Sequence, residues 1–132
     1  MEVQAIKVIE EKIIASLKNI QMDVNHGYAV DSYTVLSRSD YRFRGEPRDI
    51  ILYEDNCIKY KLFDTTLYLY DFETRLHKVL CSTYSNTTAS RVKALLTMDP
   101  AVSDIHIKNG KYCIKKNYDR IETITKGGIY EW

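Results

Sequence analysis

Apolar residues recur at steps of three and four near the start of the chain, and this spacing limits the folds open to it. The apolar positions are Ile6, Ile9, Ile13, Leu17 and Ile20. Glutamates and lysines take the other faces, which predicts an amphipathic helix over residues 3–20. Burying such side chains contributes roughly 1.5–3 kcal/mol each, so this helix must lie against an apolar surface. A sheet is the expected surface.

The next stretch, residues 21–49, keeps no period and is punctuated by Gly and Pro. It predicts a long connection with one short strand at residues 33–36. Short β-favouring runs then follow, and they predict three or four antiparallel strands. These runs cover residues 50–53, 57–63, 66–70 and 77–83.

Tyrosine is the compositional anomaly, with 11 Tyr against 3 Phe and 1 Trp. Its ring supplies rigid contact area and its hydroxyl needs a partner, so tyrosine suits strand surfaces and binding faces alike. Leu67 and Leu69 alternate with Tyr68 and Tyr70, which predicts leucines on one face of that strand and tyrosines on the other. The tyrosine face is either a second packing surface or a binding surface.

A second, shorter helix is expected after a run of hydroxyl and amide side chains. Its apolar positions are Ala89, Val92, Leu95 and Leu96. Thr87 or Thr88 would cap it, and it would end near Met98 because Pro100 cannot continue a helix.

The dipeptide Asn109-Gly110 lies between the alternating runs 105–108 and 111–115, which is a strong signal for a β-hairpin. A further strand near residues 121–125 follows. The predicted fold is therefore a single α+β domain over residues 1–132, with an N-terminal amphipathic helix packed on an antiparallel sheet, a second short helix and a C-terminal β-hairpin. Tyr130 and Trp132 either close a homodimer or cover the core.

The charge balance excludes a global attraction to polyanions. Lys and Arg number 19, and Asp and Glu number 18, which leaves a net charge of +1. The first residues mix acids and lysines with apolar positions, so neither a secretory signal nor an Arg-rich transit peptide is expected, and the predicted location is the cytoplasm. The cysteines Cys57, Cys81 and Cys113 are odd in number and widely spaced, which favours reduced thiols and predicts no metal and no cofactor.

No catalytic spacing is present among the residues that could act as nucleophile or base. His26, His77 and His106 form no known motif with the cysteines or carboxylates. A non-enzymatic protein is therefore expected, although a site assembled in space stays open.

A local basic cluster, which we call the arginine segment, is the first candidate contact site. It comprises Arg38, Tyr41, Arg42, Phe43, Arg44 and Arg48. Arginine beside aromatic residues is suited to phosphates and stacked bases. The same composition is typical of protein interface hot spots. A solvated loop with internal ion pairs is the third interpretation.

Two further candidate sites follow. Lys111, Lys115 and Lys116, with Lys108, surround the predicted hairpin. They either extend the basic surface or protect an edge strand from pairing. The second site lies at the start of the second helix, where hydroxyls and backbone N–H groups can hold an anion or small ligand. Its residues are Thr87, Thr88, Ser90 and Arg91.

Residues 84–91 read YSNTTASR and follow a strand meander at the start of a helix. This resembles the Tyr-Ser-x-Thr-Thr-Ser-Arg-His-like motif of a small uncharacterised domain common in phage and mobile-element proteins. Ala89 interrupts the motif, and Val92 stands where a His is expected. The resemblance implies a mobile-element origin, and small phage proteins of this kind are often antagonists of bacterial immunity.

The predicted function is thus a non-enzymatic, phage-type binding protein in the host cytoplasm. It would inhibit a bacterial defence system, such as CRISPR-Cas, by occupying the surface of a host protein or nucleoprotein. Direct binding of nucleic acid and sequestration of a nucleotide signal are the alternatives.

Overall fold

A computed structural model describes residues 3–21, 33–36, 49–63, 65–82 and 85–132 of the chain. The helices are α1 (Val3–Gln21) and α2 (Asn86–Leu96). One sheet contains β1 (Tyr33–Leu36), β2 (Asp49–Glu54), β3 (Cys57–Leu62), β4 (Thr65–Asp71), β5 (Leu76–Leu80) and β9 (Ile129–Glu131), in that order. A second sheet contains β6 (Val102–Lys108), β7 (Lys111–Lys116) and β8 (Arg120–Thr125).

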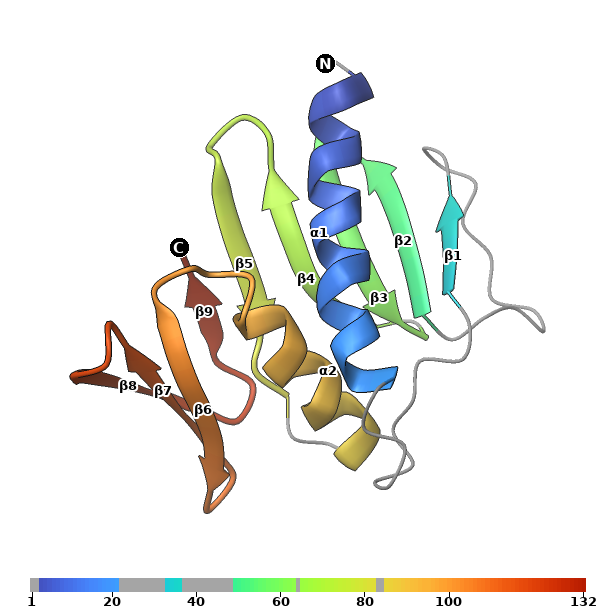
Figure 1. Cartoon of the computed structure of the whole chain (residues 1–132). Coiled ribbons are helices and arrows are strands. Elements are labelled where there is room, and N and C mark those ends of the chain that lie inside the picture. Colours follow the sequence, from blue (N-terminus) through green and yellow to red (C-terminus); the bar gives the residue numbers. More distant parts are fainter. Residues whose placement is uncertain (1–2, 22–32, 37–48, 64, 83–84) are drawn as a thin grey trace.

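The two helices lie side by side over one face of the larger sheet, and the smaller sheet stands beside α2 (Figure 1). This arrangement confirms the predicted α+β class, the N-terminal helix on a sheet, the second short helix and the C-terminal hairpin. Among the described residues, no helix is long and apolar enough to cross a membrane.

Strands β2 to β5 pair antiparallel, as their sequence pattern predicts. The short strand β1 instead joins β2 in parallel, with Tyr33 opposite Asp49. Strand β9 pairs antiparallel with β5, so the end of the chain returns to the first sheet. In the β6–β7 hairpin, Asn109 and Gly110 both have positive φ, of 54° and 73°. Two such residues in succession are what a tight hairpin turn of this kind requires.

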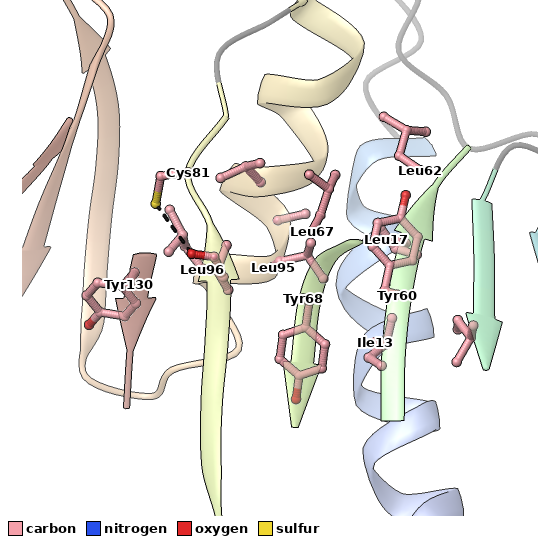
Figure 2. Packing of buried hydrophobic residues seen from close by; sticks show 14 of the residues in the cluster. Ile13, Leu17, Tyr60, Leu62, Leu67, Tyr68, Cys81, Leu95, Leu96 and Tyr130 are labelled. Carbon is pink, nitrogen blue, oxygen red and sulfur yellow. Dashed lines mark hydrogen bonds between the residues drawn. The ribbon is translucent and has the colours of Figure 1, made fainter. Parts of the chain in front are cut away.

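The core forms between the helices and the sheet (Figure 2). From the helices it takes Ile9, Ile13, Leu17, Val92, Leu95 and Leu96, all of them buried. The periodic positions of α1 thus face the sheet, which confirms the predicted amphipathic helix. From the second sheet the same core takes Tyr112 and Ile114. The two sheets therefore share one core.

A β-bulge in β4 overturns the predicted separation of leucines from tyrosines. Tyr60 lies opposite Tyr68, but the next pair is Lys61 with Thr66, so Leu67 is an extra residue. A bulge of this kind disrupts strict alternation, and here both Leu67 and Tyr68 are buried in the core. The alternating pattern could not show this because bulges leave no mark on it.

Four tyrosines serve the core rather than a binding face. Tyr60, Tyr68, Tyr112 and Tyr130 are fully buried or nearly so. Each hydroxyl has a partner: Asp49 for Tyr60, His77 for Tyr68, the backbone of Ser82 for Tyr112 and Asp99 for Tyr130. The packing interpretation therefore holds for these four residues, and Tyr130 packs within its own chain.

The N-cap of α2 is Ser85, so the predicted caps Thr87 and Thr88 are wrong. The Ser85 Oγ accepts a hydrogen bond from the backbone N–H of Thr88 at 3.2 Å. Thr88 already lies inside the first turn, and its hydroxyl packs 3.1 Å from the Ser85 Oγ. The helix ends at Leu96, two residues before the predicted end.

Candidate nucleic-acid interface

The arginine segment lies outside the residues that the structure describes. Its members Arg38, Tyr41, Arg42, Phe43, Arg44 and Arg48 all belong to residues 37–48. Their role in contacting a partner stays a prediction.

Arg91, the arginine of the predicted anion site at the start of α2, forms a buried ion pair with Asp49. Arg91 Nε donates to Asp49 Oδ1 at 2.7 Å, and Nη2 donates to Oδ2 at 3.1 Å. The Tyr60 hydroxyl donates to the same Oδ1. All three side chains are completely buried. Arg91 therefore ties α2 to the start of β2, while anion binding by Thr87, Thr88 and Ser90 stays a prediction.

The charge state of Arg91 follows from this pairing. Burial alone lowers the pKa of the guanidinium, but the hydrogen bonds and the negative charge of Asp49 outweigh burial and raise that pKa. Burial and the same carboxylate also raise the pKa of Tyr60 well above its ordinary value. Arg91 is thus held as a guanidinium cation, and Tyr60 keeps its phenolic proton.

Three of the four lysines around the predicted hairpin lie on the outer face of the smaller sheet, which we call the lysine face. Strand register places Lys108 opposite Lys111, and Asp104 opposite Lys115. Lys115 in turn lies opposite Ile121 of β8. Because alternate residues share a face, Lys108, Lys111 and Lys115 all project from the same side of the sheet. All three are exposed.

Lys116 is separated from this group by the same alternation. It lies on the inner face, where its Nζ is 3.6 Å from Glu122 Oε1 and 5.2 Å from the centroid of the Tyr130 ring. Its charge is thus used within the fold. The structure brings together Lys111, Lys115 and Lys108 but not Lys116.

The lysine face is open in two ways. Within the described residues, Lys108, Lys111 and Lys115 take part in no ion pair. In the same part of the chain, β6 and β8 each pair with β7 alone, so their outer edges are unpaired. Asp104 is the acidic residue on this face. The surface therefore carries net positive charge, whereas the whole chain is nearly neutral.

An exposed aromatic residue stands at one end of the lysine face. Tyr118 lies in the turn between β7 and β8 and is 81% exposed. Its backbone φ is 67°, and that of Asn117 is 53°. The Ser103 Oγ accepts from the Tyr118 N–H at 3.2 Å and donates to the Lys115 carbonyl at 3.1 Å. This hydroxyl therefore holds the turn against the sheet.

Sequence reasoning did not single out Tyr118. The available signal was the segment Asn117-Tyr118-Asp119 between two β-favouring runs, since Asn and Asp are frequent in hairpin turns. A tyrosine in such a turn has no core to enter.

His77 belongs to a cluster of aromatic rings. Its Nδ1 lies 2.8 Å from the Tyr68 hydroxyl, and its ring stacks on Trp132 with centroids 4.6 Å apart. The Tyr70 ring is 4.5 Å away. The cluster packs β9 against β5, and the Trp132 ring packs against His77 of its own chain. In the described residues, no three His, Cys, Asp or Glu side chains are grouped to hold a metal ion.

We expect His77 to make the stability of the fold depend on pH. Burial lowers the pKa of its imidazole from the ordinary 6.5, and the charge of Lys12 lowers it further, while Asp99 acts in the opposite direction. The unfolded chain therefore binds a proton more readily, and the free energy of unfolding falls as pH drops below about 6.5. Urea midpoints at about pH 7.5 and 5.5 should differ less in His77→Phe than in the wild type.

His106 provides the matched control because it is an exposed strand histidine on the lysine face. His106→Phe therefore controls for the loss of an imidazole from an exposed position. An unchanged pH dependence in His77→Phe would contradict the assignment.

Cys81 is buried in the core, and burial raises the pKa of its thiol to about 12. It is therefore protonated at neutral pH and a poor nucleophile.

No protein family, curated protein or solved structure matches the chain. The geometry of this structure is therefore the evidence for the lysine face as a candidate site.

Proposed function

We propose that the chain is a binding protein whose lysine face binds the nucleic acid of a nucleoprotein. A bacterial defence complex is the partner class that the resemblance of residues 84–91 implies. The observation that carries the proposal is the grouping of Lys108, Lys111 and Lys115, all exposed and outside any ion pair in the described residues. Lysines in this setting attract phosphates and release their counterions.

The spacing of the lysines supports a phosphate backbone as the ligand. Lys111 and Lys115 are four residues apart on one strand, which is about 13 Å at 3.3 Å per residue. Two cations at this separation can contact separate phosphates of one backbone. Lys108 lies beside Lys111 on the neighbouring strand and adds a third cation.

The alternative role of these lysines is protection of an edge strand. Lys108 lies on β6, which is an edge of the sheet, and it suits that role. Lys111 and Lys115 lie on β7, which has a neighbour on each side. A central strand needs no such protection, so two of the three lysines favour the binding role.

The proposal predicts a binding affinity that falls steeply with salt and depends on the three lysines. The test compares wild type with Lys108→Gln/Lys111→Gln/Lys115→Gln by fluorescence anisotropy on labelled oligonucleotides over a range of salt concentrations. Each phosphate contact contributes about 0.7–0.9 to the slope of log K against log salt. The variant's slope should therefore be shallower by about 2–3, with affinity roughly 100-fold weaker near 0.1 M salt.

A matched control removes the same charge elsewhere. Lys7, Lys12 and Lys93 are exposed on the helices, and their replacement by Gln should leave most of the affinity and slope in place. Equal losses in both triple variants would show a response to net charge alone and would contradict the lysine face. Absence of any binding by the wild type would reject nucleic acid as the ligand.

A further inference from the structure

We infer that the lysine face recognises single-stranded nucleic acid and that Tyr118 stacks on one of its unpaired bases. The inference rests on the proposed function, because the lysines supply the affinity for the backbone. It adds the form of the nucleic acid and the residue that selects it.

The exposure of Tyr118 is the first observation. The side chain is 81% exposed, whereas Tyr60, Tyr68, Tyr112 and Tyr130 are at most 1% exposed. An aromatic ring left in water forgoes the stabilisation that its burial would give. A base stacked on the ring would restore much of that apolar contact.

The fixed position of Tyr118 is the second observation. Positive φ is rare for a bulky residue and costs roughly 1–2 kcal/mol. The hydrogen bonds of the Ser103 hydroxyl to the Tyr118 N–H and the Lys115 carbonyl hold the turn in this conformation. The backbone that presents the ring is therefore tied to the strand that carries two of the lysines.

The neighbours of the turn form a surface suited to an unpaired base. The turn closes the β7–β8 hairpin at the Lys115 end, and Ile121 lies opposite Lys115 on the same face. Ile121 is 66% exposed. This end of the lysine face therefore carries an apolar side chain and a cation, and the turn with the exposed Tyr118 ring begins at the same end of β7.

A duplex cannot use this surface fully, because its bases are already stacked inside the helix. Unpaired bases are free to stack on aromatic side chains, and proteins commonly bind them on sheet faces that combine rings with cations. Base stacking is tolerant of sequence, so a binder without strong sequence preference is expected.

The test measures anisotropy of a labelled single-stranded oligothymidine and of a mixed-sequence duplex of equal length with wild type, Tyr118→Ala and Tyr118→Phe. Loss of one stacked base weakens binding by about 5- to 150-fold. We expect that loss in Tyr118→Ala on the single strand, and less than about a twofold change in Tyr118→Phe, which keeps the ring. The salt slope of Tyr118→Ala should equal that of the wild type, since no phosphate contact is removed.

Phe63 offers a matched control. It is 58% exposed, lies between β3 and β4 and also has a positive φ, of 52°. Phe63→Ala removes an exposed aromatic ring from a comparable backbone on the other sheet and should bind like the wild type. Thermal melting of each variant checks that the fold is intact.

The outcomes separate this inference from the proposed function. If Tyr118→Ala binds like the wild type while the triple lysine variant is weakened, stacking is rejected and the lysine face stands. Duplex binding as tight as single-strand binding likewise rejects the inference alone. No binding of either probe by the wild type rejects both.

Discussion

Replacing Arg91 with methionine is expected to lower the free energy of unfolding by about 3–5 kcal/mol. The replacement removes the guanidinium that pairs with the Asp49 carboxylate, which is completely buried. A buried carboxylate that loses its guanidinium partner has a large desolvation cost, and the hydrogen bond from Tyr60 offsets only part of it. Urea unfolding of wild type and Arg91→Met measures the difference.

The half-exposed ion pair between Lys78 and Glu131 provides the control. Its Nζ–Oε2 distance is 3.7 Å, and both side chains are nearly half exposed. Lys78→Met should cost less than about 1 kcal/mol, because water screens such a pair. The double variant Asp49→Leu/Arg91→Met should lose less than the sum of the two single variants. A cost for Arg91→Met no larger than that for Lys78→Met would show that the pair does not hold α2 to β2.

Replacing Tyr112 with alanine should lower the free energy of unfolding by about 3–5 kcal/mol, the range for deleting a large buried ring. Tyr112 lies on the inner face of the smaller sheet, is completely buried and belongs to the shared core. Its hydroxyl also donates to the Ser82 carbonyl at 2.5 Å, just beyond β5. The ring therefore fastens the smaller sheet to the larger one, and urea unfolding measures its loss.

Tyr118→Ala is the matched control, since it removes the same side chain from an exposed position in the same sheet. It should change the free energy of unfolding by less than about 0.5 kcal/mol. Tyr112→Phe keeps the ring and should cost only about 1 kcal/mol for the hydrogen bond. A similar cost for Tyr112→Ala and Tyr118→Ala would mean that the inner face of the smaller sheet is not packed.

These two buried anchors bear on the proposed binding surface. Tyr112 fixes the inner face of β7 in the core, and strand alternation then directs Lys111 and Lys115 outward. The lysine face is thus a consequence of how the smaller sheet packs. Variants on the outer face can test binding without disturbing that packing.

The parts of the fold that were predictable from sequence are those specified by near neighbours in the chain. The helical spacing from Ile6 to Leu17 predicts α1, and Asn109-Gly110 predicts the β6–β7 turn, because both signals lie within one element. The predictions that are wrong concern single positions within an element. A bulge at Leu67 and a cap at Ser85 depend on contacts that alternation and propensity do not record.

The candidate site was predictable only in part. The sequence indicates a basic hairpin, but the four lysines of this stretch do not show which of them share a face until β6 and β7 are in register. Lys116 then falls on the inner face beside Glu122. Arg91 is a second example. An arginine after a run of hydroxyl side chains suggests an anion site, yet its guanidinium pairs with Asp49, which is far away in the chain.

The sequence by itself determined the two helices, most of the strands and the presence of unusually many tyrosines, because periodicity, turn residues and composition act over a few residues. Only the tertiary structure decided that, among the described residues, Tyr60, Tyr68, Tyr112 and Tyr130 enter the core while Tyr118 stays exposed to water. It also decided that Arg91 forms a buried ion pair with Asp49 while Lys108, Lys111 and Lys115 remain exposed. The physical reason is that burial and charge pairing depend on residues distant in the chain, and these meet only when the sheets and helices pack.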